Sequence, residues 1–190
     1  MNCKRITFIF LLFSPGIIGL CSCVSATAGG TLPYIWLTNS SRFILLHPEN
    51  IEKPLDGPQL ISATFGEQEY NMLTWVKADE TGINMSLLNE MGAAMGELSF
   101  HNGAIFFTSS VFPQTLNPAY IIADFQFCFY NAASIGKAMR NIGLSFEETE
   151  NRRRILDGNN IIIEINKNLN TVVLINHLRG YVYSLEGDFT

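Results

Sequence analysis

The stretch Gly96-Glu-Leu-Ser-Phe-His-Asn-Gly-Ala-Ile-Phe-Phe-Thr108 predicts two short strands joined by a tight turn. At its centre, Asn102-Gly103 is the dipeptide most favoured in two-residue hairpins, because such turns need a positive φ at both central residues. We therefore expect the segment 96–101 to pair antiparallel with the segment 104–108.

Outward from this hairpin, turn residues divide the chain into further strand-like runs: 59–65, 68–78, 83–87, 161–166, 171–176 and 181–186. Their connections are short, whereas parallel strands need a crossover of a dozen or more residues. We therefore predict a mainly β fold in which residues 59–108 and 145–187 form one antiparallel meander.

Two helices are expected between the two strand-rich regions. Asn117-Pro118 is a favourable helix start, with a capping side chain followed by proline in the first turn. Ile121, Phe125 and Phe129 then follow at helical spacing. A second short helix is predicted from Ser134 through Met139, ending at Gly143.

Several predicted strands carry apolar side chains on both faces. In 68–78, Tyr70, Met72 and Val76 share one face, and Leu73 and Trp75 share the other. A sheet with one solvated face would alternate more cleanly. Either helices cover the second face in a filled core, or that face lines an apolar groove. For the groove, the candidate residues are Tyr70, Met72, Trp75, Phe106, Phe125 and Phe129.

The N-terminus has the features of an export signal. Lys4-Arg5 precedes an apolar run from Ile6 to Leu20, which ends in Leu20-Cys21-Ser22-Cys23. Leu20 and Ser22 before Cys23 resemble the lipobox of bacterial lipoproteins, which implies cleavage before Cys23 and acylation of its sulfur. The alternative is an ordinary secretory signal cut after Ala26 or Ala28. We thus expect a signal peptide over 1–22, a tether over 23–31 and one domain over 32–190.

Charge restricts the partners. The chain has a formal net charge of −5, and cleavage before Cys23 would leave 10 basic and 17 acidic side chains. This balance disfavours nucleic acid and anionic lipid headgroups, both of which attract clustered Lys and Arg. Membrane attachment is therefore expected through the acyl chains on Cys23. Cys128 would then be the one unmodified cysteine, and we expect it to be a small buried hydrophobe.

The sequence offers little for catalysis or for a metal. His47, His101 and His177 have no second histidine or cysteine at ligand spacing, so no zinc site is predicted. The nucleophile-elbow motif, the phosphate loop and the dinucleotide fingerprint are missing from the sequence. We expect a protein that is not an enzyme and needs no cofactor.

Two charged features have competing interpretations. Arg152-Arg153-Arg154 follows Glu147, Glu148 and Glu150, and we expect a solvated hairpin in which acid and base pair across strands. The alternative is a cationic patch for an anionic headgroup or an acidic partner. Asp124 lies in the apolar run 121–129, and we expect it on the solvent side of an amphipathic helix rather than in a local pair.

Three segments together carry a family resemblance: Ala123-Asp124-Phe125-Gln126, Arg152 to Leu156, and Arg179-Gly180-Tyr181. From about Leu37 to Glu186, the chain resembles a family of uncharacterised bacterial lipoproteins that form a numbered domain of unknown function. One departure is Tyr130-Asn131, where the family usually has a tryptophan-proline pair.

The resemblance implies a fold similar to the lipoprotein-localisation factors LolA and LolB, an incomplete antiparallel barrel whose concave apolar face is lidded by two helices. Members often accompany genes for aryl-polyene or fatty-acid-like lipid synthesis, beside a LolA-like carrier. The family has no assigned catalytic residues.

The resulting expectation is a lipoprotein at the periplasmic face of the outer membrane that holds or transfers an acylated or polyene-type lipid. The alternative is a non-catalytic scaffold or docking subunit of an envelope complex for lipid synthesis or export.

Overall fold

A computed structural model describes residues 32–89, 91–113 and 115–189. The predicted signal peptide, Cys23 and the tether lie outside the described residues. Ten antiparallel strands form one sheet in the order β7-β6-β5-β4-β3-β12-β11-β10-β9-β8. The strands are β3 (Leu55–Phe65), β4 (Gln68–Asp79), β5 (Gly82–Leu88), β6 (Ala94–His101), β7 (Ala104–Ser109), β8 (Ser145–Thr149), β9 (Arg152–Asp157), β10 (Asn160–Lys167), β11 (Thr171–Asn176) and β12 (Tyr181–Glu186).

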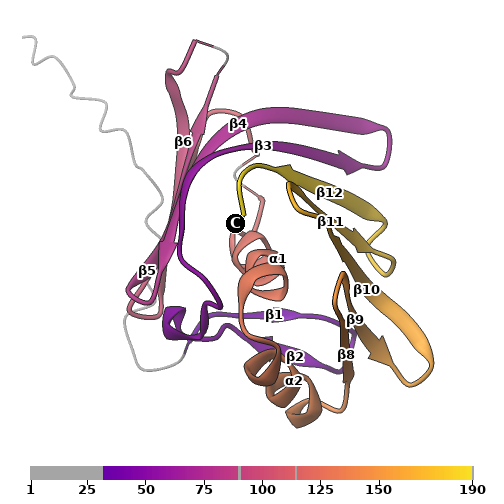
Figure 1. Ribbon diagram of the computed structural model, residues 1–190. Coiled ribbons are helices and arrows are strands. Elements are labelled where there is room, and N and C mark those ends of the chain that lie inside the picture. Colours follow the sequence, from indigo (N-terminus) through magenta and orange to yellow (C-terminus); the bar gives the residue numbers. More distant parts are fainter. Residues whose placement is uncertain (1–31, 90, 114, 190) are drawn as a thin grey trace, which may run out of the picture.

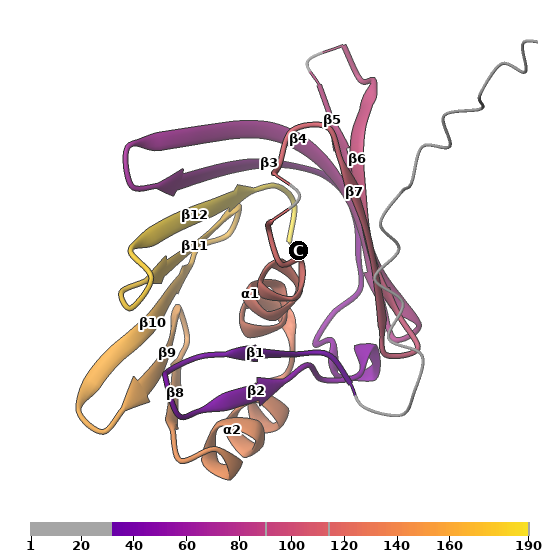
Figure 2. The same ribbon diagram turned by 180° about the vertical axis from the view of Figure 1, so that it is seen from behind.

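The sheet confirms the prediction that residues 59–108 and 145–187 pair with each other. The two halves meet where β12 pairs with β3, from Tyr181 opposite Phe65 to Glu186 opposite Leu60. The sheet is not closed into a barrel, since β7 and β8 are its two edges. It bends strongly, so that its concave side surrounds a helix (Figures 1 and 2).

The central hairpin is also confirmed. His101 pairs with Ala104, and between them Asn102 has φ 49° and Gly103 has φ 77°. Both values lie in the left-handed region, where Asn and Gly are the best-tolerated residues.

The helix inside the curve is α1 (Ala119–Phe129), and the second helix is α2 (Ala132–Asn141). The Asn117 side chain accepts a hydrogen bond of 3.0 Å from the Ala119 N–H, as expected of a helix start. Asn131 caps α2 by accepting from the Ser134 N–H at 2.8 Å, so α2 begins two residues before the predicted Ser134. After α2, Gly143 has φ 78° and turns the chain toward β8.

Nine of the 11 residues of α1 are buried, including Asp124 and Gln126. A helix that is covered on nearly every side belongs to the core rather than to the surface. The prediction that Asp124 faces solvent is therefore wrong: only 8% of Asp124 is exposed. Gln126 secures α1 to the N-terminal segment, because its Nε2 donates to the Leu46 carbonyl at 2.8 Å and its Oε1 accepts from the Leu46 N–H at 2.9 Å.

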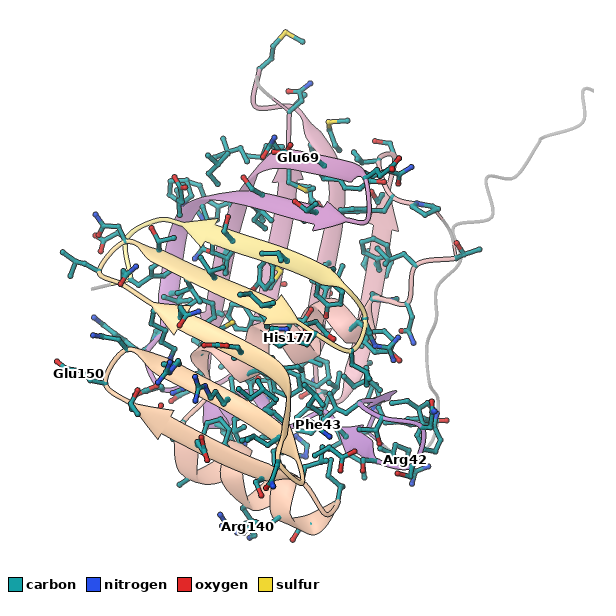
Figure 3. The ribbon with its side chains drawn as sticks, turned by 90° about the vertical axis from the view of Figure 1, so that its right-hand side faces the viewer. Arg42, Phe43, Glu69, Arg140, Glu150 and His177 are labelled. Atoms are coloured by element: carbon teal, nitrogen blue, oxygen red, sulfur yellow. The ribbon has the colours of Figure 1, made fainter. Side chains whose placement is uncertain are left out.

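The N-terminal segment forms a small sheet that the sequence did not suggest. β1 (Tyr34–Trp36) pairs with β2 (Arg42–Ile44), and the short helix η1 (Pro48–Asn50) follows. Phe43 is buried in the core whereas its neighbour Arg42 is exposed, and Figure 3 labels both. The figure also shows Glu69, near the tip of the β3–β4 hairpin, and Arg140 of α2 at opposite ends of the molecule.

The expectation of a solvated arginine hairpin fails at Arg153, which is 1% exposed. Its Nη1 donates to the carbonyl oxygens of Phe127, Cys128 and Tyr130 at 3.1, 3.0 and 2.7 Å. These carbonyls lie at the C-terminal end of α1, where the helix leaves acceptors unpaired and favours a cation. Glu148 and Glu52 pair with the same guanidinium at 2.6 and 2.8 Å.

Within the described ranges, no helix has the length and apolar character needed to cross a membrane.

Candidate ligand cavity

A cavity of about 430 Å³ lies between the concave face of the sheet and α1. Its volume falls in the range of small-molecule sites. Strands β3 to β7, strand β12, the loop before α1 and the first half of α1 all contribute to it. The lining residues are Ile61, Ala63, Tyr70, Met72, Thr74, Met85, Leu87, Leu98, Phe107, Phe112, Pro113, Leu116, Tyr120, Ile121, Asp124, Arg179, Tyr181 and Tyr183.

Of the six predicted groove residues, Tyr70 and Met72 line the cavity. Trp75 does not, because side chains alternate along β4 and the even-numbered residues face inward. Trp75 is 46% exposed, and its Nε1 donates to Asp56 Oδ1 at 3.0 Å. Phe106 is absent from the lining for the same reason, since its neighbour Phe107 takes the inward position on β7.

Phe125 and Phe129 belong to the filled core beside the cavity. Their rings lie 4.8 Å apart, and Phe129 packs against Phe189 at 5.4 Å. The helix instead presents Tyr120, Ile121 and Asp124 to the cavity. These three positions share one side of the helix because residues three and four apart are neighbours on its surface.

The predicted lid of two helices also needs correction, since α2 supplies no lining residue. The helical side of the cavity is formed by α1 together with the preceding loop, which contributes Phe112, Pro113 and Leu116. The centres of the Phe112 and Tyr70 rings are 5.7 Å apart, so the loop packs onto β4.

A buried polar cluster forms one part of the wall. The Tyr181 hydroxyl donates to Asp124 Oδ2 at 2.6 Å, and Asn176 Nδ2 donates to the Tyr181 oxygen at 3.2 Å. Burial raises the pKa of Asp124 to about 7, and the Tyr181 hydrogen bond and the charge of Arg179 only partly oppose this shift. Asp124 is therefore a carboxyl group whose charge changes near neutral pH.

Arg179 lies beside this cluster in the turn between β11 and β12. Its guanidinium is 4.2 Å from the centre of the Tyr120 ring, and its Nη2 donates to the Tyr120 hydroxyl at 2.6 Å and to the Trp36 carbonyl at 2.7 Å. Arg179 was not among the site residues predicted from the sequence. The one available signal was its place in the Arg179-Gly180-Tyr181 segment, which it shares with the resembled family.

The remaining candidates for chemistry do not converge. Cys128 is buried as predicted, and burial raises the pKa of its thiol to about 12. His101 contacts Thr81 O and Asn84 Oδ1 at 3.1 and 2.9 Å, away from the cavity lining. Over the part of the chain that the structure describes, no three His, Cys, Asp or Glu side chains form a group that could hold a metal ion.

A family model described as "Protein of unknown function (DUF3261)" matches residues 58–186. The chain therefore belongs to this family. The match begins within β3 and ends at the last residue of β12, so it includes every residue of the cavity lining and excludes β1 and β2. No curated protein matches the chain.

Proposed function

We propose that this protein holds or transfers a lipid with a long apolar chain, acylated or polyene-type, in the cavity between the sheet and α1. We further propose that it does so as a lipoprotein anchored through Cys23 at the periplasmic face of the outer membrane. The observation that carries the proposal is the composition of the wall. Of the lining residues that the structure describes, Asp124 is the one acid and Arg179 the one base, and nearly all the others are aliphatic or aromatic.

Such a wall would bind a lipid by removing its chain from water. Burial stabilises by about 0.8 kcal/mol per methylene, so eight methylenes would provide roughly 6 kcal/mol before ordering costs. Met72 and Met85 have flexible side chains that would adapt to chains of different shape. The open sheet and the helix within its curve support the more specific proposal of a LolA- or LolB-like half barrel.

The proposal is tested by a substitution that fills the cavity with a larger side chain. Ala63 faces inward on β3 and lines the cavity, whereas its neighbour Thr64 is exposed. Ala63→Phe should weaken binding of the fluorescent polyene fatty acid parinaric acid to the purified full chain by at least about tenfold, and Thr64→Phe should leave it unchanged. Thermal unfolding of both variants checks that the fold survives. If the parent protein binds no such probe at micromolar concentration, or if Ala63→Phe binds it normally, the proposed function is wrong.

The alternative, a scaffold in an envelope complex, is favoured by one observation. Leu60 and Leu73 pair across β3 and β4 on the outer face of the sheet, and with Trp75 they are between 38% and 46% exposed. Exposed apolar groups on one face are typical of protein contacts. The test uses the variants Leu73→Ser and Trp75→Ser. If they abolished the activity of the protein in cells while the purified variants still bound lipid like the parent protein, this second role would be supported.

A further inference from the structure

The cavity is apolar, but its charge is distributed unevenly. Among the described residues, Arg179 is the one cation of the lining, and no ion pair between them involves it. A fixed cation beside an apolar cavity attracts a ligand that combines an apolar chain with a negative group.

The geometry holds this cation in place. Both hydrogens of Nη2 have acceptors, the Tyr120 hydroxyl and the Trp36 carbonyl, and the guanidinium lies over the Tyr120 ring. Nε and Nη1 make no hydrogen bond with the described residues, which leaves three N–H groups for a ligand. Because these contacts already restrict the side chain, little conformational entropy remains to be lost on binding.

The acid of the lining does not neutralise Arg179 by direct contact. Asp124 is instead held by the Tyr181 hydroxyl, on the buried side of the cavity wall. The Arg179 side chain, in contrast, is solvent-exposed as well as part of the lining. A charged head group could therefore reach Arg179 while staying partly hydrated, and the chain could enter the cavity.

We propose that Arg179 binds an oxyanion head group, a carboxylate or a phosphate, of a lipid whose apolar chain occupies the cavity. This inference rests on the proposed function and adds the polarity and orientation of the ligand. The head contacts the β11–β12 turn, and the chain runs along β3 and β4 toward Thr74.

Thr74 is another polar residue of the lining whose hydroxyl the ligand could meet. It is 1% exposed, lines the cavity, and its hydroxyl oxygen has no hydrogen-bond partner among the described residues. In the sheet register Thr74 pairs with Gln59, six positions along β3 from Phe65, the partner of Tyr181. This separation is about 20 Å along the strand. A neutral hydroxyl cannot offset the desolvation of an oxyanion, so the head group belongs at Arg179.

The experiment measures displacement of parinaric acid by three ligands of equal chain length: hexadecanoic acid, hexadecyl phosphate and hexadecanol. The full chain is held in phosphatidylcholine nanodiscs at pH 7.5, with empty nanodiscs as the background. The parent protein should prefer at least one of the two anionic ligands over the alcohol by at least about tenfold, as expected for a charge-assisted hydrogen bond. Whichever anionic ligand competes better identifies the head group as a carboxylate or a phosphate.

In Arg179→Gln the preference for the better anionic ligand over hexadecanol should fall to within about twofold. In the control Thr74→Val the preference should persist. Because Arg179 also contacts Trp36, the preference of the parent protein is measured at rising salt as well, where it should shrink through screening. Equal affinity of the parent protein for acid, phosphate and alcohol would overturn the head-group inference and leave the proposed function standing. So would a preference that survives Arg179→Gln or that disappears in Thr74→Val. If no ligand binds the parent protein, both proposals fail.

Discussion

Asp124 shows how a single buried carboxyl group shapes the cavity wall. Its oxygen accepts from Tyr181, which also accepts from Asn176, so the group is hydrogen-bonded despite its burial. These bonds do not fully replace water, and the pKa of Asp124 is raised to about 7 from an ordinary value of 3.8. At a pH between these two pKa values, the carboxyl group is mainly protonated in the folded protein and mainly ionised in the unfolded chain.

We predict a pH-dependent stability from this group. Between about pH 4 and pH 7 the folded state binds more protons than the unfolded state, so the contribution of Asp124 to stability is lost as the pH rises through this window. The loss is at most about 1.4 kcal/mol per pH unit. Asp124→Asn keeps the hydrogen-bond acceptor but cannot titrate. Urea unfolding at pH 5, 6, 7 and 8 should show the variant gaining stability relative to the parent protein. A difference that is constant over this range would contradict the prediction.

At the scale of elements, Arg153 joins α1 to the sheet. It projects from β9 to the three carbonyls at the end of the helix, and Glu52 and Glu148 balance its charge. A buried cation in this arrangement replaces the hydrogen bonds that the helix end would otherwise make with water. Its removal would leave the helix-end carbonyls without this donor and both partner carboxylates, Glu52 and Glu148, without their cation.

We therefore predict that Arg153→Met lowers the free energy of unfolding by about 3–5 kcal/mol. The matched control is Arg152→Met on the same strand, where the native side chain is more exposed and lies 3.8 Å from Glu164. That substitution should cost less than about 1 kcal/mol. Denaturant unfolding measures the free energy of unfolding of both variants. If both lose the same amount, the contacts of Arg153 with the helix end do not stabilise the fold more than an exposed ion pair does.

At the scale of the whole molecule, one continuous sheet bends around α1 (Figures 1 and 2). The cavity lies between this sheet and the first half of the helix. The family match spans both halves of the sheet and the helices between them, so the curved sheet and its cavity form one unit. The lipid carrier that we propose would act where its lipid is, and the proposed acyl anchor on Cys23 would decide that location.

We predict that Cys23 carries the acyl anchor. Cys23→Ala should abolish incorporation of radiolabelled palmitate and accumulate the uncut precursor, because the modification and the cleavage both depend on the cysteine sulfur. Cys21→Ala is the control and should be labelled and cleaved like the parent protein. A Cys23→Ala variant of mature size that still carries label would refute the assignment.

Local chemistry made much of the sheet predictable. Asn102-Gly103 allowed the central turn because it tolerates the positive φ values that the hairpin needs. Short connections required antiparallel pairing, and Asn117-Pro118 marked the approach to α1. The pairing of β1 with β2 was missed because each strand has only three residues, which is too short for a periodic pattern.

The candidate site depended on contacts between residues far apart in the chain. The alternation of β4 separated Tyr70 and Met72 from Trp75 in the sequence itself, yet only the curvature of the sheet around α1 shows which face is concave. Aspartate and arginine usually lie at the surface, so the sequence did not predict the burial of Asp124 and Arg153. Their burial is possible because Tyr181 donates to Asp124 and the carbonyls at the end of α1 accept from Arg153. The sequence by itself determined the turns and the strand order along the chain, because these depend on the backbone preferences of neighbouring residues. The tertiary structure decided the cavity and its charges, because a polar group can be buried only where distant segments supply its partners.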